Sequence, residues 1–209
     1  MQISGSIFGV HFKAQKLLTE ILNESDPNIK ALGISALVSE LFRNSGFDPI
    51  VVGGSAIEFY TDGAYMSGDI DICFRGIKSP SPREKADIMD GVLGATGSVR
   101  TWKVGDVFVD LLGTVEAFAD NSFQSLKTPD GSIVLQPPED LLVERVFEAR
   151  GWTQPSPEGE DCARKMMRAV LDEAIPFDWK EAERIADLPA YRCLDHLLAM
   201  KDDVLKKDE

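Results

Sequence analysis

Two kinds of hydrophobic pattern alternate along this 209-residue chain, and together they predict an α/β fold. In some segments apolar residues recur every three or four positions, which is typical of amphipathic helices. In others a short apolar run lies between glycine, proline or aspartate residues, which is typical of strands. We expect helices over residues 11–25, 29–44, 83–94, 139–150, 160–174, 179–186 and 191–205. We expect strands over residues 49–52, 69–74, 100–104, 107–112, 123–126 and 132–135.

The order of these elements divides the sequence into three parts. Residues 1–46 hold an extended lead-in of about ten residues, followed by two helices that pack on the core. Residues 47–136 hold the strands, which we expect to form a small mixed sheet flanked by helices. The dipeptide Gly105-Asp106 predicts a hairpin within this part. Residues 137–209 form a C-terminal helical region.

A glycine turn follows the first predicted strand. The apolar run that ends at Val52 is followed directly by Gly53, Gly54 and Ser55, and a helix begins there. Ser55 and Glu58 have the spacing of a capping box. A tight turn at a helix N-terminus presents backbone N–H groups, which suit it to bind phosphate.

An acidic pair lies on the next predicted strand. Asp69 and Asp71 alternate with the apolar residues Ile70, Ile72 and Phe74, a period of two that indicates a strand. Both carboxylates then lie on one face of the sheet, while the apolar side chains enter the core. Two carboxylates so close repel each other unless a cation lies between them, and Mg²⁺ prefers such oxygen ligands. The alternative is a pair of solvated aspartates on an edge strand.

A third carboxylate, that of Asp110, is the one charge in the apolar segment 107–112, which we expect to be a buried strand. A charge in such a position costs several kcal/mol unless it is paired or binds a metal. A metal site and a buried ion pair both satisfy this requirement.

This set of residues resembles the DNA polymerase β-like nucleotidyltransferase superfamily. Its members combine a Gly-Gly or Gly-Ser turn, a DxD strand and a third aspartate on a later strand, and the resemblance covers residues 49–112. It implies a nucleotidyltransferase topology in which Asp69, Asp71 and Asp110 are catalytic and hold two Mg²⁺ or Mn²⁺ ions.

The resemblance also implies a substrate and a set of residues that bind it. The substrate is an NTP, with ATP among the candidates, whose phosphates are held by Gly53, Gly54 and Ser55. Ser67 is near the DxD strand in sequence and is a further candidate. The implied reaction moves an NMP group to an acceptor hydroxyl and releases pyrophosphate. The acceptor is an RNA end such as that of a tRNA, a protein, or a small molecule such as an aminoglycoside.

The C-terminal region resembles nucleotidyltransferases of the abortive-infection toxin type, which belong to toxin–antitoxin pairs. In those proteins a basic residue on the first helix of this region contacts the nucleotide, and an aspartate begins the following helix. Arg145 and Asp161 take these places, with Arg150 as a further candidate. Arginine stands here where lysine is usual, so its role is electrostatic because it remains protonated. The alternative for each arginine is an ion pair on a solvated helix face.

Composition and charge restrict the possible partners. The chain has 22 basic and 35 acidic residues, a net charge of −13, which argues against sequence-independent binding of long DNA. A basic cluster of Arg164, Lys165 and Arg168 could still receive a triphosphate or an RNA end. Three scattered cysteines, the absence of a signal peptide and the absence of a long apolar run predict a cytoplasmic protein outside the membrane.

Two alternatives to an active enzyme use the same fold. One is a nucleotide-binding or regulatory protein that has lost turnover, for which Arg145 leaves room. The other is a component of a toxin–antitoxin pair, in which the acidic surface meets an antitoxin-like protein, and this alternative is compatible with catalysis.

Overall fold

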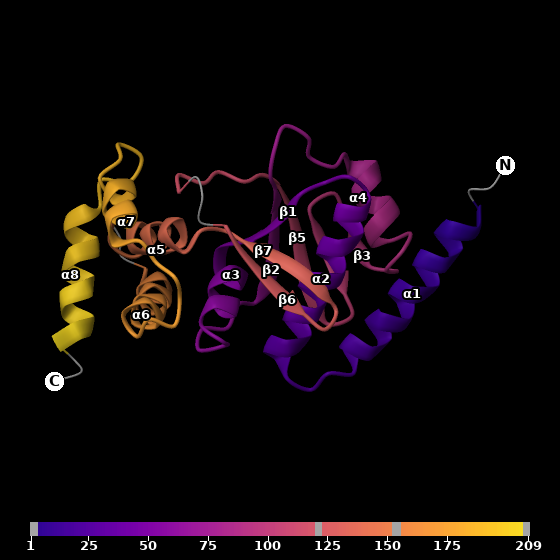
Figure 1. Cartoon of the computed structure of the whole chain (residues 1–209), viewed down its shortest axis with the longest axis horizontal. Coiled ribbons are helices and arrows are strands. Elements are labelled where there is room, and N and C mark those ends of the chain that lie inside the picture. The colour runs from indigo at the N-terminus through magenta and orange to yellow at the C-terminus, as the bar shows by residue number, and fades with distance from the viewer. Residues whose placement is uncertain (1–3, 120–122, 152–155, 207–209) are drawn as a thin grey trace. The chain divides into compact units, whose positions relative to one another are not determined.

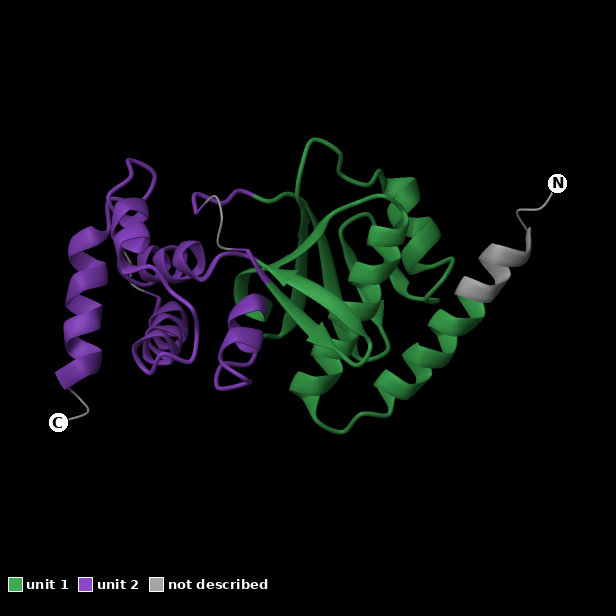
Figure 2. Cartoon of the chain, in the orientation of Figure 1, with its two compact units in different colours: residues 1–55, 67–115, 125–135 green, residues 56–66, 116–124, 136–209 purple. Residues whose placement is uncertain are grey.

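The structure is a computed structural model, and it describes residues 4–119, 123–151 and 156–206, with side chains from His11 onward. The chain forms two compact units, each described by itself below (Figure 2). Unit 1 comprises residues 1–55, 67–115 and 125–135, and unit 2 comprises residues 56–66, 116–124 and 136–209. The three predicted sequence domains remain predictions, since the compact units combine segments from more than one of them.

Unit 1 combines helices with a mixed β-sheet (Figure 1). Its helices are α1 (Ser4–Leu22), α2 (Pro27–Asn44), α4 (Pro82–Met89) and the start of α3 (Gly53–Tyr60). Its strands are β1 (Pro49–Val52), β2 (Asp69–Phe74), β3 (Thr96–Ser98), β4 (Thr101–Val104), β5 (Val107–Thr114), β6 (Gln124–Thr128) and β7 (Gly131–Leu135). This architecture, with the helices of unit 2, confirms the predicted α/β fold.

The described strands form one sheet in the order β3-β4-β5-β2-β1-β7-β6. Strand β2 lies near its centre, parallel to β5 on one side and antiparallel to β1 on the other. Strands β4 and β5 form the predicted hairpin through Gly105, whose φ of +64° suits glycine. The strand that carries the DxD residues is therefore held between two neighbours, which fixes the direction of its side chains.

One face of the sheet is packed against helices. Helix α2 begins at its N-cap Asp26, whose side chain accepts hydrogen bonds from two backbone N–H groups, and it packs on β1 and β7. Its Phe42 meets Phe74 of β2 at a ring-centroid distance of 5.2 Å, and Phe47 completes the aromatic cluster. Phe74 and the isoleucines of β2 thus point toward α2, so the aspartates of the same strand point to the opposite face.

Unit 2 is a group of helices with a short π-helical turn. Its elements are the rest of α3, α5 (Pro138–Val146), η1 (Phe147–Gly151), α6 (Pro157–Leu171), α7 (Trp179–Ala186) and α8 (Leu194–Leu205). Helix α5 packs on α6, α7 and α8. Its leucines and valines are fully buried at Leu141, Leu142, Val143 and Val146. Within the described residues, no helix is long and apolar enough to cross a membrane.

Several predicted boundaries need correction. Residues 4–10, which we expected to be extended, are helical, because the apolar spacing of α1 continues into them despite their glycines. Helix α4 ends at Met89 rather than at Gly94, whose φ of +66° is left-handed. Helix α8 begins at Leu194 rather than Tyr191, and the short strand β3 was missed.

Candidate active site

The turn between β1 and α3 brings the glycine pair to the end of a buried strand. Gly53 has a φ of +62°, a conformation that side chains disfavour, which explains the glycine there. Gly54 and Ser55 are buried, and Ser55 is only 1% exposed. The turn is therefore formed as the sequence predicts.

Ser55 connects this turn to the acidic strand. Its hydroxyl donates to the carbonyl oxygen of Val52 at 3.0 Å and accepts a hydrogen bond from the backbone N–H of Asp71 at 3.1 Å. The predicted capping box with Glu58 is wrong, because this hydroxyl is used between β1 and β2 instead. Ser55 thus fixes the position of Asp71 relative to the glycine turn.

The residues of β2 alternate between the core and the opposite face as predicted. Ile70, Ile72 and Phe74 are at most 1% exposed, Asp69 is exposed and Asp71 is half-buried. The hydroxyl of Ser67 lies 3.5 Å from Oδ1 of Asp69, at the limit of hydrogen-bond distance. The structure therefore places Ser67 beside the acidic pair.

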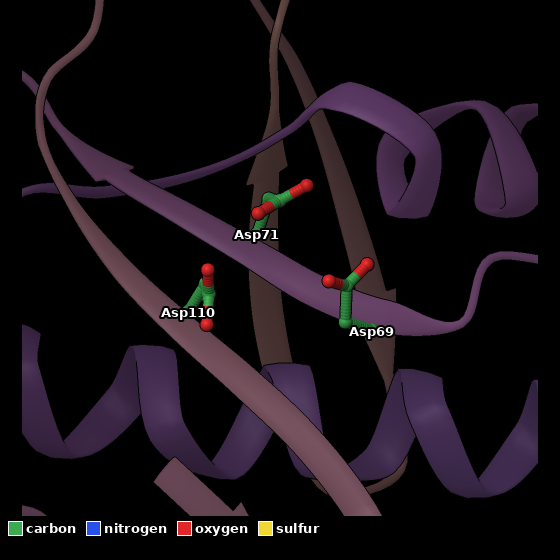
Figure 3. Close-up of side chains that lie close together, drawn as sticks. All are labelled: Asp69, Asp71 and Asp110. Carbon is green, nitrogen blue, oxygen red and sulfur yellow. The ribbon is translucent and has the colours of Figure 1, made fainter. Parts of the chain in front are cut away.

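Asp110 joins this pair through the pairing of β2 with β5. The two strands are parallel and Asp110 is the direct neighbour of Asp71 in their register. One ligand oxygen of each of Asp69, Asp71 and Asp110 lies within 4.8 Å of the others. Figure 3 shows the three carboxylates gathered above the two strands. We call these residues the aspartate triad.

The aspartate triad fits a divalent cation by the chemistry of its donors. It offers only carboxylate oxygens, the ligands that Mg²⁺ and Mn²⁺ prefer. Three negative charges within 4.8 Å of one another repel, and a bound cation relieves that repulsion. The predicted assignment of metal ligands stays a prediction, and the geometry is compatible with it.

Arg100 is a neighbour of the aspartate triad that the sequence did not indicate. It lies in the turn between β3 and β4, and its Nε donates to Oδ2 of Asp110 at 3.1 Å. The Arg100 side chain is 68% exposed and that of Asp110 is 14% exposed. The ion pair that we considered for Asp110 thus exists, but its cation lies at the surface. A metal ion and Arg100 would compete for the same carboxylate.

Phe108 is a second neighbour that the sequence did not indicate. We expected it in a buried strand, yet its side chain is 46% exposed. It is two residues before Asp110, so it lies on the same face of β5. The burial of Val109 and Leu111 shows that only the other face of β5 enters the core.

The remaining predicted nucleotide-binding residues belong to unit 2. Arg145 is mostly buried and forms an ion pair with Glu148. Asp161 is exposed, pairs with Lys165 at 2.8 Å, and lines a pocket of about 410 Å³ together with Tyr65, Met66, Pro157 and Glu158. Both roles in nucleotide binding stay predictions.

Three further basic residues of unit 2 form ion pairs with acidic neighbours. Arg150 and Arg164 both bind Glu160 and Asp203, at distances of 2.7–3.4 Å. Lys165, as noted above, pairs with Asp161. These contacts favour the structural alternative for Arg150, Arg164 and Lys165 over an open phosphate-binding cluster.

Comparisons with known proteins identify the fold. No protein-family model and no curated protein sequence matches the chain. Among solved structures, an antigenic nucleotidyltransferase-like protein from Paracoccidioides brasiliensis matches with a TM-score of 0.50 and 14% identity, over 81% of this chain and 93% of that one. The chain therefore has the fold of the DNA polymerase β-like nucleotidyltransferase superfamily, whereas membership of the abortive-infection toxin type stays a prediction.

Two further solved structures match less well. ANT(2″)-Ia in complex with adenylyl-2″-tobramycin has a TM-score of 0.44 and 10% identity, over 66% of this chain and 88% of that one. The polyadenylate synthase of Megavirus has a TM-score of 0.39 and 13% identity, over 81% of this chain and 38% of that one. We base the fold on the first structure alone.

Proposed function

We propose that this protein transfers an NMP group from an NTP to an acceptor hydroxyl and releases pyrophosphate. The observation that carries the proposal is the aspartate triad, with its oxygens within 4.8 Å of one another on one face of the sheet. The nucleotidyltransferase fold supports the same reaction class. Neither feature alone would suffice, because exposed acidic groups are common and a fold hosts several functions.

In this proposal Asp69, Asp71 and Asp110 hold two divalent cations, Mg²⁺ or Mn²⁺. Such cations would activate the acceptor oxygen and offset the charge of the triphosphate and of the leaving oxygen. The register of β2 with β5 aligns Asp71 with Asp110, and this pairing fixes the distance between the two proposed metal ligands. Ser55 restrains β2 through its hydrogen bond to the backbone of Asp71.

The proposed chemical step is a displacement at phosphorus. The acceptor oxygen forms a bond to the α-phosphorus while the bond from that phosphorus to the α,β-bridging oxygen breaks. Pyrophosphate leaves with the bridging oxygen and its electron pair. The proton of the acceptor hydroxyl passes to a base, for which Asp110 is the candidate because it lies beside the other two carboxylates.

The glycine turn is the proposed site of the triphosphate. Gly53 and Gly54 would bind phosphate through the backbone at the start of α3, where the helix dipole also favours an anion. The hydroxyl of Ser55 is engaged within the protein, so its contribution would be to hold the turn in place as well as to offer its backbone N–H. Arg145 and Asp161 of unit 2 are the other two residues for which the sequence predicts a role in nucleotide binding.

The experiment that tests the function is a calorimetric titration of each of the four NTPs, with and without Mg²⁺. We expect Mg²⁺-dependent binding of at least one NTP to the wild-type protein and its loss in Asp71→Asn. Asp87→Asn is the matched control, since Asp87 is an exposed carboxylate on α4 in the same unit. Retained Mg²⁺-dependent binding in both Asp69→Asn and Asp71→Asn would contradict the proposal.

A further inference from the structure

The pairing of β2, β5 and β4 arranges six side chains beside one another on the face of the aspartate triad. The register gives two rows across the three strands. The first row is Asp71, Asp110 and Thr101, and the second is Asp69, Phe108 and Lys103. Residues paired directly across strands have neighbouring side chains, so the triad continues into a surface of different chemistry.

Phe108 is the apolar centre of this surface beside the aspartate triad. Its ring is 46% exposed although the next residue, Val109, is fully buried. The Nζ of Lys103 lies 5.7 Å from the ring centroid, a cation–π distance. An exposed aromatic ring beside a cation is the arrangement with which proteins stack a nucleic-acid base and hold its phosphate.

The charges on this surface differ from those of the whole chain. The chain carries a net charge of −13, yet the groups that flank the triad on the β4 side are Lys103 and Arg100, both exposed. A cation beside the Phe108 ring and a second one at Asp110 suit an acceptor that is anionic and aromatic. A cationic amino sugar would be repelled by them, and a protein hydroxyl brings no phosphate for them to bind.

Hydroxyl groups extend the surface toward the edge of the sheet. Thr101 is exposed on β4, and its partner Ser98 and the neighbouring Thr96 are exposed on β3. From β5 to β3 the surface spans about 10 Å, two strand spacings. Such hydroxyls can donate hydrogen bonds to phosphate oxygens. The surface is therefore long enough, and polar enough, to bind the end of a nucleic-acid chain.

We propose that this face of β4 and β5 binds the acceptor, and that the acceptor is the 3′ end of a single-stranded nucleic acid. The terminal base stacks on Phe108, Lys103 and Arg100 bind the phosphates, and the 3′-hydroxyl reaches Asp110. This inference rests on the proposed function and gives it a substrate class. The 3′ oxygen then forms the bond to the α-phosphorus as pyrophosphate leaves, and the chain grows by one nucleotide.

The test measures binding of a fluorescently labelled single-stranded hexaribonucleotide by anisotropy, without NTP or Mg²⁺. We expect Phe108→Ala to weaken binding by at least about tenfold and Phe108→Trp to retain it, since each stacked base contributes strongly. Lys103→Glu should weaken binding and lower the slope of log affinity against log salt by about 0.7 for each phosphate that the variant no longer neutralises.

The chain offers matched controls for both side chains. Phe12 is 77% exposed and Lys16 has a side chain that is 71% exposed, and both lie on α1. Phe12→Ala and Lys16→Glu should bind the hexaribonucleotide as the wild type does. Circular dichroism confirms that each variant is folded. Equal affinities of Phe108→Ala and Phe12→Ala, or no binding by the wild type, would overturn the proposal.

Further probes distinguish between ligands that could each bind to an aromatic ring beside a cation. The corresponding hexadeoxyribonucleotide and a single nucleoside monophosphate are titrated in parallel, and we expect the mononucleotide to bind more weakly than either strand. Tobramycin serves as the cationic probe. Binding of tobramycin that displaces the hexaribonucleotide without dependence on Lys103 would contradict the charge argument and thus the proposal.

The NTP titrations separate this inference from the proposed function. Loss of Mg²⁺–NTP binding in Asp71→Asn, together with an unchanged hexaribonucleotide affinity in Phe108→Ala, would overturn only the acceptor site. Retained NTP binding in the triad variants would overturn the proposed function itself. Loss of NTP binding in Phe108→Ala would also contradict the inference, since Phe108 would then contact the nucleotide rather than the acceptor.

Discussion

The two units use carboxylates in opposite ways. In unit 1 the carboxylates of the aspartate triad lie together on one face of the sheet, where the hydroxyl of Ser67 lies near Asp69 and Arg100 pairs with Asp110. In unit 2 the carboxylates of Glu139 and Asp140 are buried at the start of α5 and bind backbone N–H groups. Both groups are acidic clusters in the sequence, but the first is a candidate cation site and the second stabilises the fold.

Asp140 shows what a structural carboxylate requires. It is fully buried, and its two oxygens accept hydrogen bonds from the backbone N–H groups of Phe118 and Ala119 at 2.8 and 2.9 Å. Burial raises the pKa of Asp140, while these hydrogen bonds act in the opposite direction. Each oxygen therefore has a defined partner within the fold, and the group fixes the loop before unit 2's helices.

The aspartate triad shows the complementary case. Three carboxylates share one small region, and their described donors include the exposed side chain of Arg100 and the hydroxyl of Ser67. Saturation by backbone groups thus marks carboxylates that hold the fold. Three carboxylates gathered within 4.8 Å of one another repel, and an external cation would relieve that repulsion; mutations should separate the two kinds of carboxylate.

The largest effect we predict is that of Asp71→Asn on transfer. Nucleotidyl transfer should fall by about 1,000-fold or more, which corresponds to about 4 kcal/mol of activation free energy, because a metal ligand is removed. The free energy of unfolding should change by less than about 1 kcal/mol, since one of three repelling charges is removed. Label transfer from an α-labelled NTP and urea unfolding measure the two quantities. An unfolded variant, or one with unchanged transfer, would remove the contrast between the units.

Asp140→Ala should have the reverse effect. Two backbone N–H groups, of which that of Ala119 is buried, lose their acceptors, and we expect the free energy of unfolding to fall by about 2–4 kcal/mol. Asp140→Asn keeps one acceptor oxygen and should cost less. Urea denaturation measured by tryptophan fluorescence gives the values. Stability equal to that of the wild type in Asp140→Ala would show that these hydrogen bonds do not hold the fold.

The sequence predicted the triad because each of its members is exceptional in its own segment. Asp69 and Asp71 interrupt an alternating apolar strand, and Asp110 is the one charge in another, so local pattern was sufficient. The strand register that aligns Asp71 with Asp110 could not be derived from the residues, and the family resemblance supplied only the topology and the set of three aspartates. Hence the fold agrees with expectation, while the roles of the three aspartates stay predictions.

What the sequence did not reveal depends on neighbours across strands. Phe108 lies in an apolar run that looks buried, and only the register with Lys103 and Asp69 places it on an open face. Arg100 is an ordinary polar residue before a strand until the β3–β4 turn brings it to Asp110. Ser55 fitted a capping box locally, but a tertiary hydrogen bond to Asp71 prevailed.

Glu144 allows a test of burial through pH. Burial raises the pKa of Glu144 to about 7, although Gln136 donates a hydrogen bond to it at 3.0 Å. Asp140 also raises this pKa, whereas Arg145 and Tyr191 lower it. A carboxyl whose pKa is higher in the folded state gives its stabilisation fully below pH 4.5, and loses it as the pH rises toward 7.

We therefore predict that the wild-type protein loses stability between pH 4.5 and 7, and that Glu144→Gln reduces this slope. At pH 8 the variant should be more stable than the wild type by about 1–2 kcal/mol, because no buried charge remains. Urea unfolding across this pH range measures the difference. Lys180→Gln, at an exposed position on α7, is the control. Parallel pH profiles of Glu144→Gln and the wild type would contradict the assigned cause.

The smallest predicted effect is that of Arg100 on metal binding by the aspartate triad. If its guanidinium occupies the place of a cation at Asp110, Arg100→Ala should raise the affinity for Mn²⁺ alone, without nucleotide. Arg100 is exposed although Asp110 is not, and a pair with an exposed partner contributes about 1 kcal/mol, so we expect a rise of about threefold to fivefold. Arg100→Lys keeps the charge and should change less, and Arg83→Ala removes a surface arginine that lies on α4. Calorimetry with Mn²⁺ measures all three. A lower affinity in Arg100→Ala would mean that Arg100 holds Asp110 in place for the metal instead of competing with it. The aspartate triad would then depend on a fixed protein partner, as the buried carboxylate of Asp140 does.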